Sequence, residues 1–130
     1  MERTEFEQLV REGVERLPAW VRKKIKNVAL LVEDEPSPTV RKQGKLKPGE
    51  TLLGLYHGIP LTERGENYGI GVTLPDTITL YQKPIEEMAH EDGMDVRDVV
   101  ADTIWHEFAH HFGMDEHEVR SREQKRDREK

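Results

Sequence analysis

The sequence contains no cysteine, and no run of apolar residues approaches the length that spans a bilayer. The missing cysteines exclude disulfides and thiolate metal sites. Residues 1–17 carry acidic side chains throughout and lack the basic end and apolar block of a secretory signal. These absences predict a cytoplasmic protein with no membrane partner.

An excess of basic residues is also missing. The net charge of -6 argues against a general nucleic-acid binder. The length of 130 residues fits one domain with a real core. We predict a single domain over residues 1–119, followed by a charged C-terminal tail over residues 120–130 in which basic and acidic side chains alternate.

Apolar spacing along the first two thirds of the chain predicts helices, then strands. Apolar residues recur at helical spacing between Phe6 and Leu17, and Pro18 suits the first turn of a second helix. The predicted strands cover residues 28–32, 52–59 and 78–85, and a polar loop is expected over residues 37–50. Pro84 should end the ladder of the last strand or mark it as a sheet edge.

The best-signalled element is a helix from Val96 to Phe112. Asp95 can cap its N-terminus, Asp98 suits the positive end of the helix dipole, and Gly113 can stop the helix. Apolar side chains form one stripe along it at spacings of three and four. The members of this stripe are Val96, Val99, Val100, Thr103 and Ile104. The whole pattern predicts an α+β fold: a short mixed or antiparallel sheet packed on helices, with the site-bearing helix near the C-terminus.

The buried stripe then changes chemistry. Its continuation receives Glu107, His110 and His111, with His106 beside it, so we expect Glu107 and His110 to point inward. Burying ionisable groups without partners costs several kcal/mol or shifts their pKa values. A bound metal ion is one partner that removes this cost.

The spacing within this segment is that of a metal site. His106 and His110 are four residues apart, so both imidazoles lie on one helix face and can converge on a tetrahedral ion. Glu107 can reach a water molecule at that ion but is not placed to chelate with the histidines. This is the H-E-x-x-H pattern of zinc ligands and general base.

A zinc site with an open position needs a third protein ligand. If Gly113 turns the chain, three extended residues span about 10 Å, enough to return below the metal. Glu116 is the first choice for the third ligand. Asp115 is a close competitor and His117 the third choice.

These residues resemble the zincin metallopeptidases, and in particular a family of small bacterial zincin-like proteins. The resemblance covers most of the chain, through the segments VALLVEDEP, LYHGIPLTER, ITLYQKPIE and HEFAHHFGMDE. It implies a small sheet backed by helices and a metal site made of His106, His110 and Glu116, with Glu107 as base. The short-spacer zincins carry histidine or aspartate at the position of Glu116, a departure that leaves Asp115 in contention. The resemblance brings no established substrate.

The predicted activity is zinc-dependent hydrolysis of peptide bonds in a peptide or an unstructured protein segment. We expect the strand at residues 78–85 to pair with the extended substrate. Tyr68 or Tyr81 can hold the oxyanion, although ordinary packing is the simpler role for both.

Three alternatives remain open at the level of sequence. The first is a non-catalytic metal-binding or regulatory protein with a zincin fold, in which Asp115 or His117 closes the fourth metal position. The second is a non-haem iron protein, since two histidines and a carboxylate also suit Fe(II). The third is a charged surface helix that binds no metal. The sequence predicts no oligomeric state.

Overall fold

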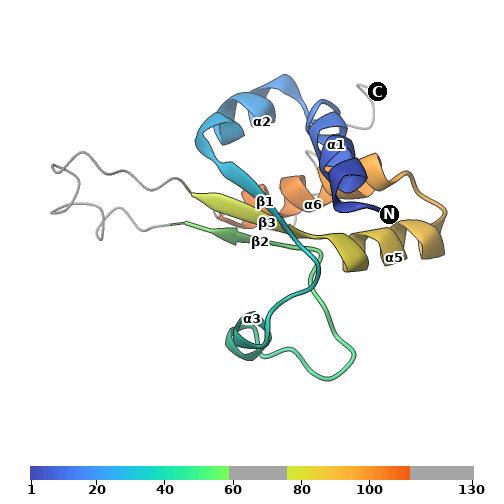
Figure 1. Cartoon of the computed structure of the whole chain (residues 1–130). Helices are drawn as coiled ribbons and strands as arrows, with labels where there is room; N and C mark the ends of the chain where they lie inside the picture. Colours follow the sequence, from blue (N-terminus) through green and yellow to red (C-terminus); the bar gives the residue numbers. More distant parts are fainter. Residues whose placement is uncertain (59–75, 112–130) are drawn as a thin grey trace, which may run out of the picture.

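The computed structural model describes residues 1–58 and 76–111, and within them it contains five α-helices, one 3-10 helix and three strands (Figure 1). In chain order these elements are α1 (Arg3–Val14), α2 (Ala19–Lys24), η1 (Ile25–Asn27), β1 (Ala29–Glu33), α3 (Pro38–Gln43), β2 (Gly54–His57), β3 (Thr77–Tyr81), α5 (Gln82–Asp92) and α6 (Val96–His111). The predicted tail at residues 120–130 lies outside the described residues.

The three strands form one mixed sheet in the order β1-β3-β2. β3 runs parallel to β1, with Leu30 opposite Ile78, and antiparallel to β2, with Tyr56 opposite Ile78. Ile78 and Leu80 of β3 are fully buried, as expected for a central strand. The predicted α+β class with a small mixed sheet is confirmed.

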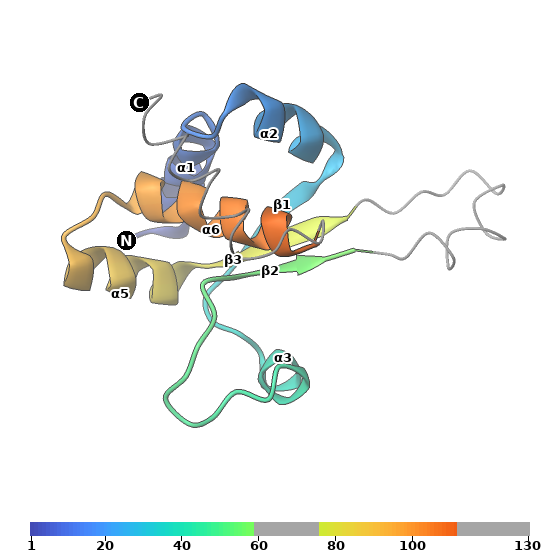
Figure 2. The ribbon, with the colours of Figure 1, turned by 180° about the vertical axis from the view of Figure 1, so that it is seen from behind.

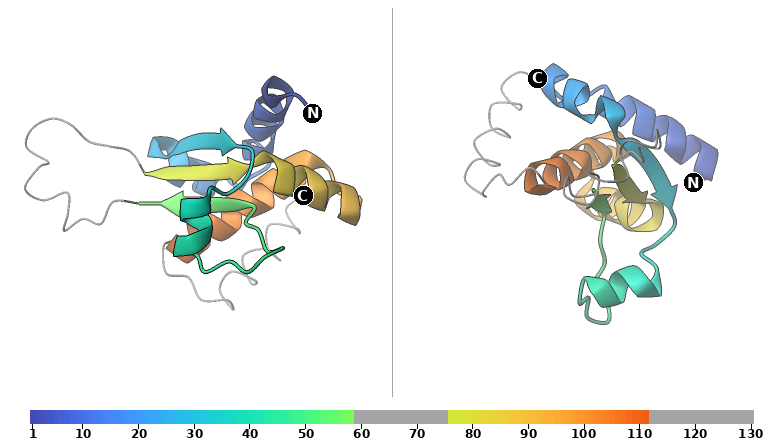
Figure 3. Two further views of the ribbon diagram at one scale, coloured as in Figure 1. Left: turned by 60° about the horizontal axis from the view of Figure 1, so that its bottom comes forward. Right: turned by 90° about the vertical axis from the view of Figure 1, so that its left-hand side faces the viewer.

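Helix α6 crosses one face of the sheet and packs on its other side against α1 (Figures 2 and 3). α1 approaches α6 closely at Gly13, where an added Cβ would lie 2.8 Å from the carbonyl oxygen of Arg97. A glycine is therefore required at this crossing. α5 follows β3 and also packs against α6, so α6 is the central element of the fold.

The core is one cluster that joins the helices to the sheet. Trp20 of α2 meets Trp105 of α6 edge-on, with ring centroids 5.7 Å apart, which fixes α2 beside the C-terminal half of α6. The buried members of the cluster are Phe6, Val10, Leu17, Val21, Ile25, Ile78, Leu80, Ile85, Ala89, Val99, Val100, Ala101, Ile104, Trp105, Phe108 and Ala109.

The expected strand at residues 78–85 is wrong in its second half. β3 ends at Tyr81, and α5 begins at Gln82 and includes Pro84 in its first turn. A proline is tolerated there because the first backbone N–H groups of a helix have no partner within it. Pro84 therefore belongs to a helix start rather than to a sheet edge. β3 itself is paired on both sides, so it cannot accept an extended peptide as an edge strand.

The expected loop at residues 37–50 also contains a short helix, α3. Its N-terminus has a recognisable signal, because the Ser37 hydroxyl accepts a hydrogen bond from the Val40 N–H at 3.1 Å and Pro38 follows directly. α3 buries none of its residues and stands apart from the helical layer (Figure 1). An apolar stripe, the usual sign of a helix, is therefore missing here.

The remaining expected elements agree with the structure to within a few residues. The two N-terminal helices, the strand near residues 28–32 and the strand within residues 52–59 are all present. The helix predicted from Val96 is present through His111, and Phe112 lies outside the described residues. Among the described helices, none is both long and apolar enough to cross a membrane.

Candidate metal site

The start of α6 is held by charged groups. The Asp95 carboxylate accepts a hydrogen bond from the Arg97 N–H at 2.8 Å, which confirms the predicted cap. The Arg97 side chain also donates to Asp95 and holds the pKa of that carboxyl well below its usual range. Asp98 in the first turn pairs with Arg16 at 2.6 Å, so its role is to anchor α6 to the end of α1.

His106 and His110 lie one turn apart on an exposed face of α6. Their ring centroids are 6.2 Å apart and their planes are inclined by 51°. Both side chains are exposed and Glu107 between them is half-buried. The expectation that His110 points into the core is therefore wrong.

The reason is that α6 is buried on more than one face. The core side continues past Ile104 through Trp105, Phe108 and Ala109, all at most 2% exposed. A single apolar stripe, extended forward, does not describe a helix packed between a sheet and another helix. The histidines lie on the strip of α6 that stays exposed between these faces. Solvent-accessible imidazoles need no metal to offset a burial cost, so the case for a metal depends on their pairing.

Glu107 is held by the backbone of the edge strand. Its carboxylate accepts a hydrogen bond from the Tyr56 N–H at 3.0 Å. Tyr56 therefore directs its N–H away from β3, toward the outer edge of β2. The hydroxyl of the same tyrosine donates to Asp76 at 3.0 Å, which keeps this part of β2 in place. The Glu107 carboxylate is thus fixed against the edge strand, one residue after His106 in the chain.

The approach of β2 to α6 depends on Gly54. A Cβ at this position would lie 2.7 Å from Thr103 Cγ2 and 3.1 Å from the carbonyl oxygen of Thr79. Any side chain here would push the strand away from the helix. Thr103 precedes Glu107 by one helical turn, and Tyr56 lies two residues beyond Gly54. The contact at Gly54 therefore sets the distance across which Glu107 meets Tyr56.

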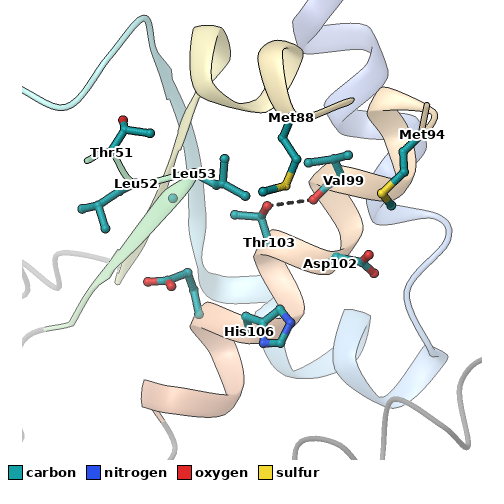
Figure 4. Close-up of a pocket in the computed structure, with 11 residues that line it drawn as sticks. Thr51, Leu52, Leu53, Met88, Met94, Val99, Asp102, Thr103 and His106 are labelled. Carbon is teal, nitrogen blue, oxygen red and sulfur yellow. Dashed lines mark hydrogen bonds between the residues drawn. The ribbon is translucent and has the colours of Figure 1, made fainter. Parts of the chain in front are cut away.

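A cavity of about 390 Å³ opens beside the site along the N-terminal half of α6 (Figure 4). Figure 4 shows His106 at one end of this cavity and Leu53, Met88 and Val99 at the other. Its lining residues are Thr51, Leu52, Leu53, Gly54, Met88, Met94, Val99, Asp102, Thr103, His106 and Glu107. Asp102 is half-buried in this wall, so it belongs to the surroundings of the site.

The donor set of the described residues fits a metal in part. Two imidazoles one turn apart on an accessible face are what zinc coordination requires of a helix, and the glutamate after the first histidine is the base of the H-E-x-x-H pattern. Within residues 1–58 and 76–111 no group of three or more possible ligands is close enough to hold an ion. Gly113 and the expected third ligands Asp115, Glu116 and His117 lie outside the described residues. The described part thus contains two candidate ligands, His106 and His110, and the candidate base Glu107.

Tyr81 is buried in the core. It is 1% exposed, and its burial raises the pKa of its hydroxyl, helped by the negative charges of Glu33 and Glu107. Tyr68 lies outside the described residues. Two further histidines, His57 on β2 and His90 on α5, are exposed.

Several residues of the site were not singled out from the sequence. Tyr56 contributes a backbone N–H, which no side-chain pattern reveals. Met88 and Met94 enter the cavity wall from α5 and the turn after it. Gly54 is the one with a usable signal, since a glycine inside a strand often marks the close approach of another segment.

The solved structures include a similar protein, a conserved hypothetical protein from Thermo thermophilus. It is 26% identical to this chain and superimposes with a TM-score of 0.56, covering 85% of this chain and 94% of its own. No curated protein matches. The family model described as zincin-like metallopeptidase matches residues 25–126, which include the H-E-x-x-H segment and all of the candidate ligands. The chain therefore belongs to the zincin-like metallopeptidase family.

Proposed function

We propose that this protein is a zinc-dependent peptidase in which Glu107 is the general base. Zinc would be held by His106, His110 and a carboxylate beyond Gly113, with Glu116 as first choice. The observation that carries the proposal is the 6.2 Å separation of two exposed imidazoles on α6, on the same helix as a carboxylate anchored to the edge strand. The family supports a metallopeptidase kind of function.

In this proposal the metal, Glu107 and Tyr56 have different roles in hydrolysis. Zinc, when bound, would polarise the scissile carbonyl and make a water molecule more acidic. Glu107 would take the proton of that water and pass it to the leaving amine. The hydrogen bond from Tyr56 would hold the carboxylate in position between these two transfers. Proton transfer by a positioned base contributes roughly 10²–10⁴-fold to the rate.

The substrate we propose is an extended peptide or an unstructured protein segment in the cytoplasm, not a nucleic acid. Of the two edge strands in the described sheet, β1 and β2, the one proposed to receive the peptide is β2, because it contacts Glu107. The Tyr56 N–H and Glu107 meet on the outer side of β2. A peptide running along that edge would bring its scissile bond next to the base.

The deciding experiment replaces Glu107 with glutamine in the full chain. Hydrolysis of an unstructured protein such as casein should fall at least about a hundredfold, because the amide cannot accept the proton. Zinc content, measured on the same samples, should stay unchanged. Glu91→Gln on the exposed side of α5 is the matched control and should retain full activity. A Glu107→Gln variant that hydrolyses casein at the original rate would contradict the assignment of the base and favour a non-catalytic metal-binding role.

The third ligand can be identified by single replacements of Glu116, Asp115 and His117 with alanine. We expect Glu116→Ala to weaken zinc binding by more than the roughly 10–100-fold that the loss of a supporting group outside the ligand set costs. His106→Ala provides the reference for the loss of a ligand on α6. If all three replacements leave the zinc affinity unchanged, the short return after Gly113 does not supply a ligand.

A further inference from the structure

The cavity beside the candidate site has apolar walls that remain accessible. Met88 and Met94 are each 38% exposed, and both line this cavity. They are two of the five large apolar side chains that are exposed in the described part of the chain. Methionine is flexible and polarisable, so it adapts its shape to a bound apolar group.

The middle of the wall is apolar as well, although it includes Thr103. The Thr103 hydroxyl donates to the Val99 carbonyl oxygen at 2.7 Å (Figure 4). That bond turns the methyl group of Thr103 toward Gly54, as the 2.7 Å approach of Thr103 Cγ2 to a built Cβ shows. The hydroxyl is thus satisfied inside the helix, and the cavity meets a methyl group.

Among the described residues, the ionisable side chains in the cavity wall are those of Asp102, His106 and Glu107. Two of these three carry carboxylates, which would repel an acidic group. The volume of about 390 Å³ is near the lower end of ligand pockets, roughly 300–1,000 Å³. Such a cavity suits one large side chain better than an extended segment.

We infer that this cavity binds a large apolar side chain of the substrate, such as leucine or phenylalanine, next to the scissile bond. Met88 and Met94 are the residues that determine this selectivity. The inference rests on the proposed function for the identity of the occupant, because the cavity leads to His106 and Glu107. The cavity's preference for apolar groups can be measured without metal and without hydrolysis.

The first test uses the metal-free full chain with 13C-labelled methionine methyl groups. The chain has four methionines, so each signal can be assigned by substitution. N-acetyl-leucinamide at millimolar concentration should shift the methyl signals of Met88 and Met94 in a saturable way and leave Met1 unmoved. N-acetyl-glutaminamide, of similar size, should shift neither. Absence of a leucinamide effect, or equal effects of both amides, would overturn the cavity assignment whether or not the protein cleaves peptides.

The second test compares zinc-loaded variants on peptides that differ at one position. The original protein should prefer leucine to glutamine at that position by at least about tenfold in kcat/KM. Met88→Gln and Met94→Gln should reduce this preference several-fold, whereas His90→Gln on the same helix α5, outside the cavity, should keep it. Cleavage with no apolar preference would overturn the inference and leave the peptidase standing. Leucinamide binding without any cleavage would support the cavity and overturn the peptidase.

Discussion

The buried faces of α6 and its exposed strip differ in what they contribute. The buried faces hold Val100, Ile104 and Ala109, each at 0% exposure, and they join α1, α5 and the sheet. The exposed strip holds His106 and His110, which lie outside the core cluster. One helix thus carries the fold on some faces and the candidate chemistry on another. Substitutions on the buried faces should mainly lower the stability of the protein, and substitutions on the exposed strip should mainly weaken metal binding.

The largest expected effect comes from a pair of substitutions, one on each side of this division. Ile104→Ala should lower the free energy of unfolding by about 2–5 kcal/mol, because it leaves a cavity in a fully packed site. His110→Ala should change it by less than about 0.5 kcal/mol, since the side chain is exposed, while abolishing tight zinc binding. Urea unfolding of the metal-free proteins and zinc titration measure the two quantities. A His110→Ala variant as unstable as Ile104→Ala would show that the strip is part of the core.

Gly54→Ala should have an effect between those of Ile104→Ala and His110→Ala, since it changes the contact between β2 and α6 next to the candidate site. The added Cβ would press on Thr103 and on the backbone of Thr79, and overpacking of this kind costs roughly 1–3 kcal/mol. The strand should move away from α6 and release the hydrogen bond from Tyr56 to Glu107.

Hydrogen exchange of the Tyr56 amide measures this release, because an outward N–H of an edge strand is otherwise open to water. Glu107→Ala should accelerate the same exchange without moving the strand, which separates the two causes. Gly44→Ala, placed after the exposed helix α3, is a control for glycine replacement as such. Unaltered exchange at Tyr56 in Gly54→Ala would contradict the proposed spacing role.

The smallest effect is expected at the start of α6, far from the histidines. Asp95→Ala removes the cap and should cost about 1 kcal/mol at neutral pH. The pKa of Asp95 is lowered in the folded protein by hydrogen bonds from Arg97, so its stabilisation is present above about pH 4 and is lost as the pH falls below that value. The difference between the original protein and Asp95→Ala should therefore shrink in acid. Asp92→Ala, at the exposed end of α5, is the control. A penalty that stays constant down to about pH 2 would refute the charged cap.

The sequence predicted α6 and its cap well, because Asp95, the valine spacing and the H-E-x-x-H segment all act within a few residues of one another. The sequence also predicted a small mixed or antiparallel sheet, and the structure confirms a mixed one. The sequence could not predict the direction of His110, because that depends on how many sides of α6 are covered. The switch from β3 to α5 at Gln82 was missed for a similar reason: Pro84 interrupts a strand and starts a helix equally well. The group that holds Glu107 is the backbone N–H of Tyr56, which the fold brings close to α6, so no local sequence pattern could predict it.

The arrangement of the chain also bears on when the protein can fold. α1 packs on α6, and β1 pairs with β3, although each pair is separated by most or much of the chain. Contacts between such distant segments form slowly, since long loops must close first. During synthesis, the N-terminal helices and the first strand must wait for α6 before they have a surface to pack against. α6 both completes the core and bears the candidate site. A chain interrupted before α6 would therefore expose its apolar residues to the quality-control machinery of the cell.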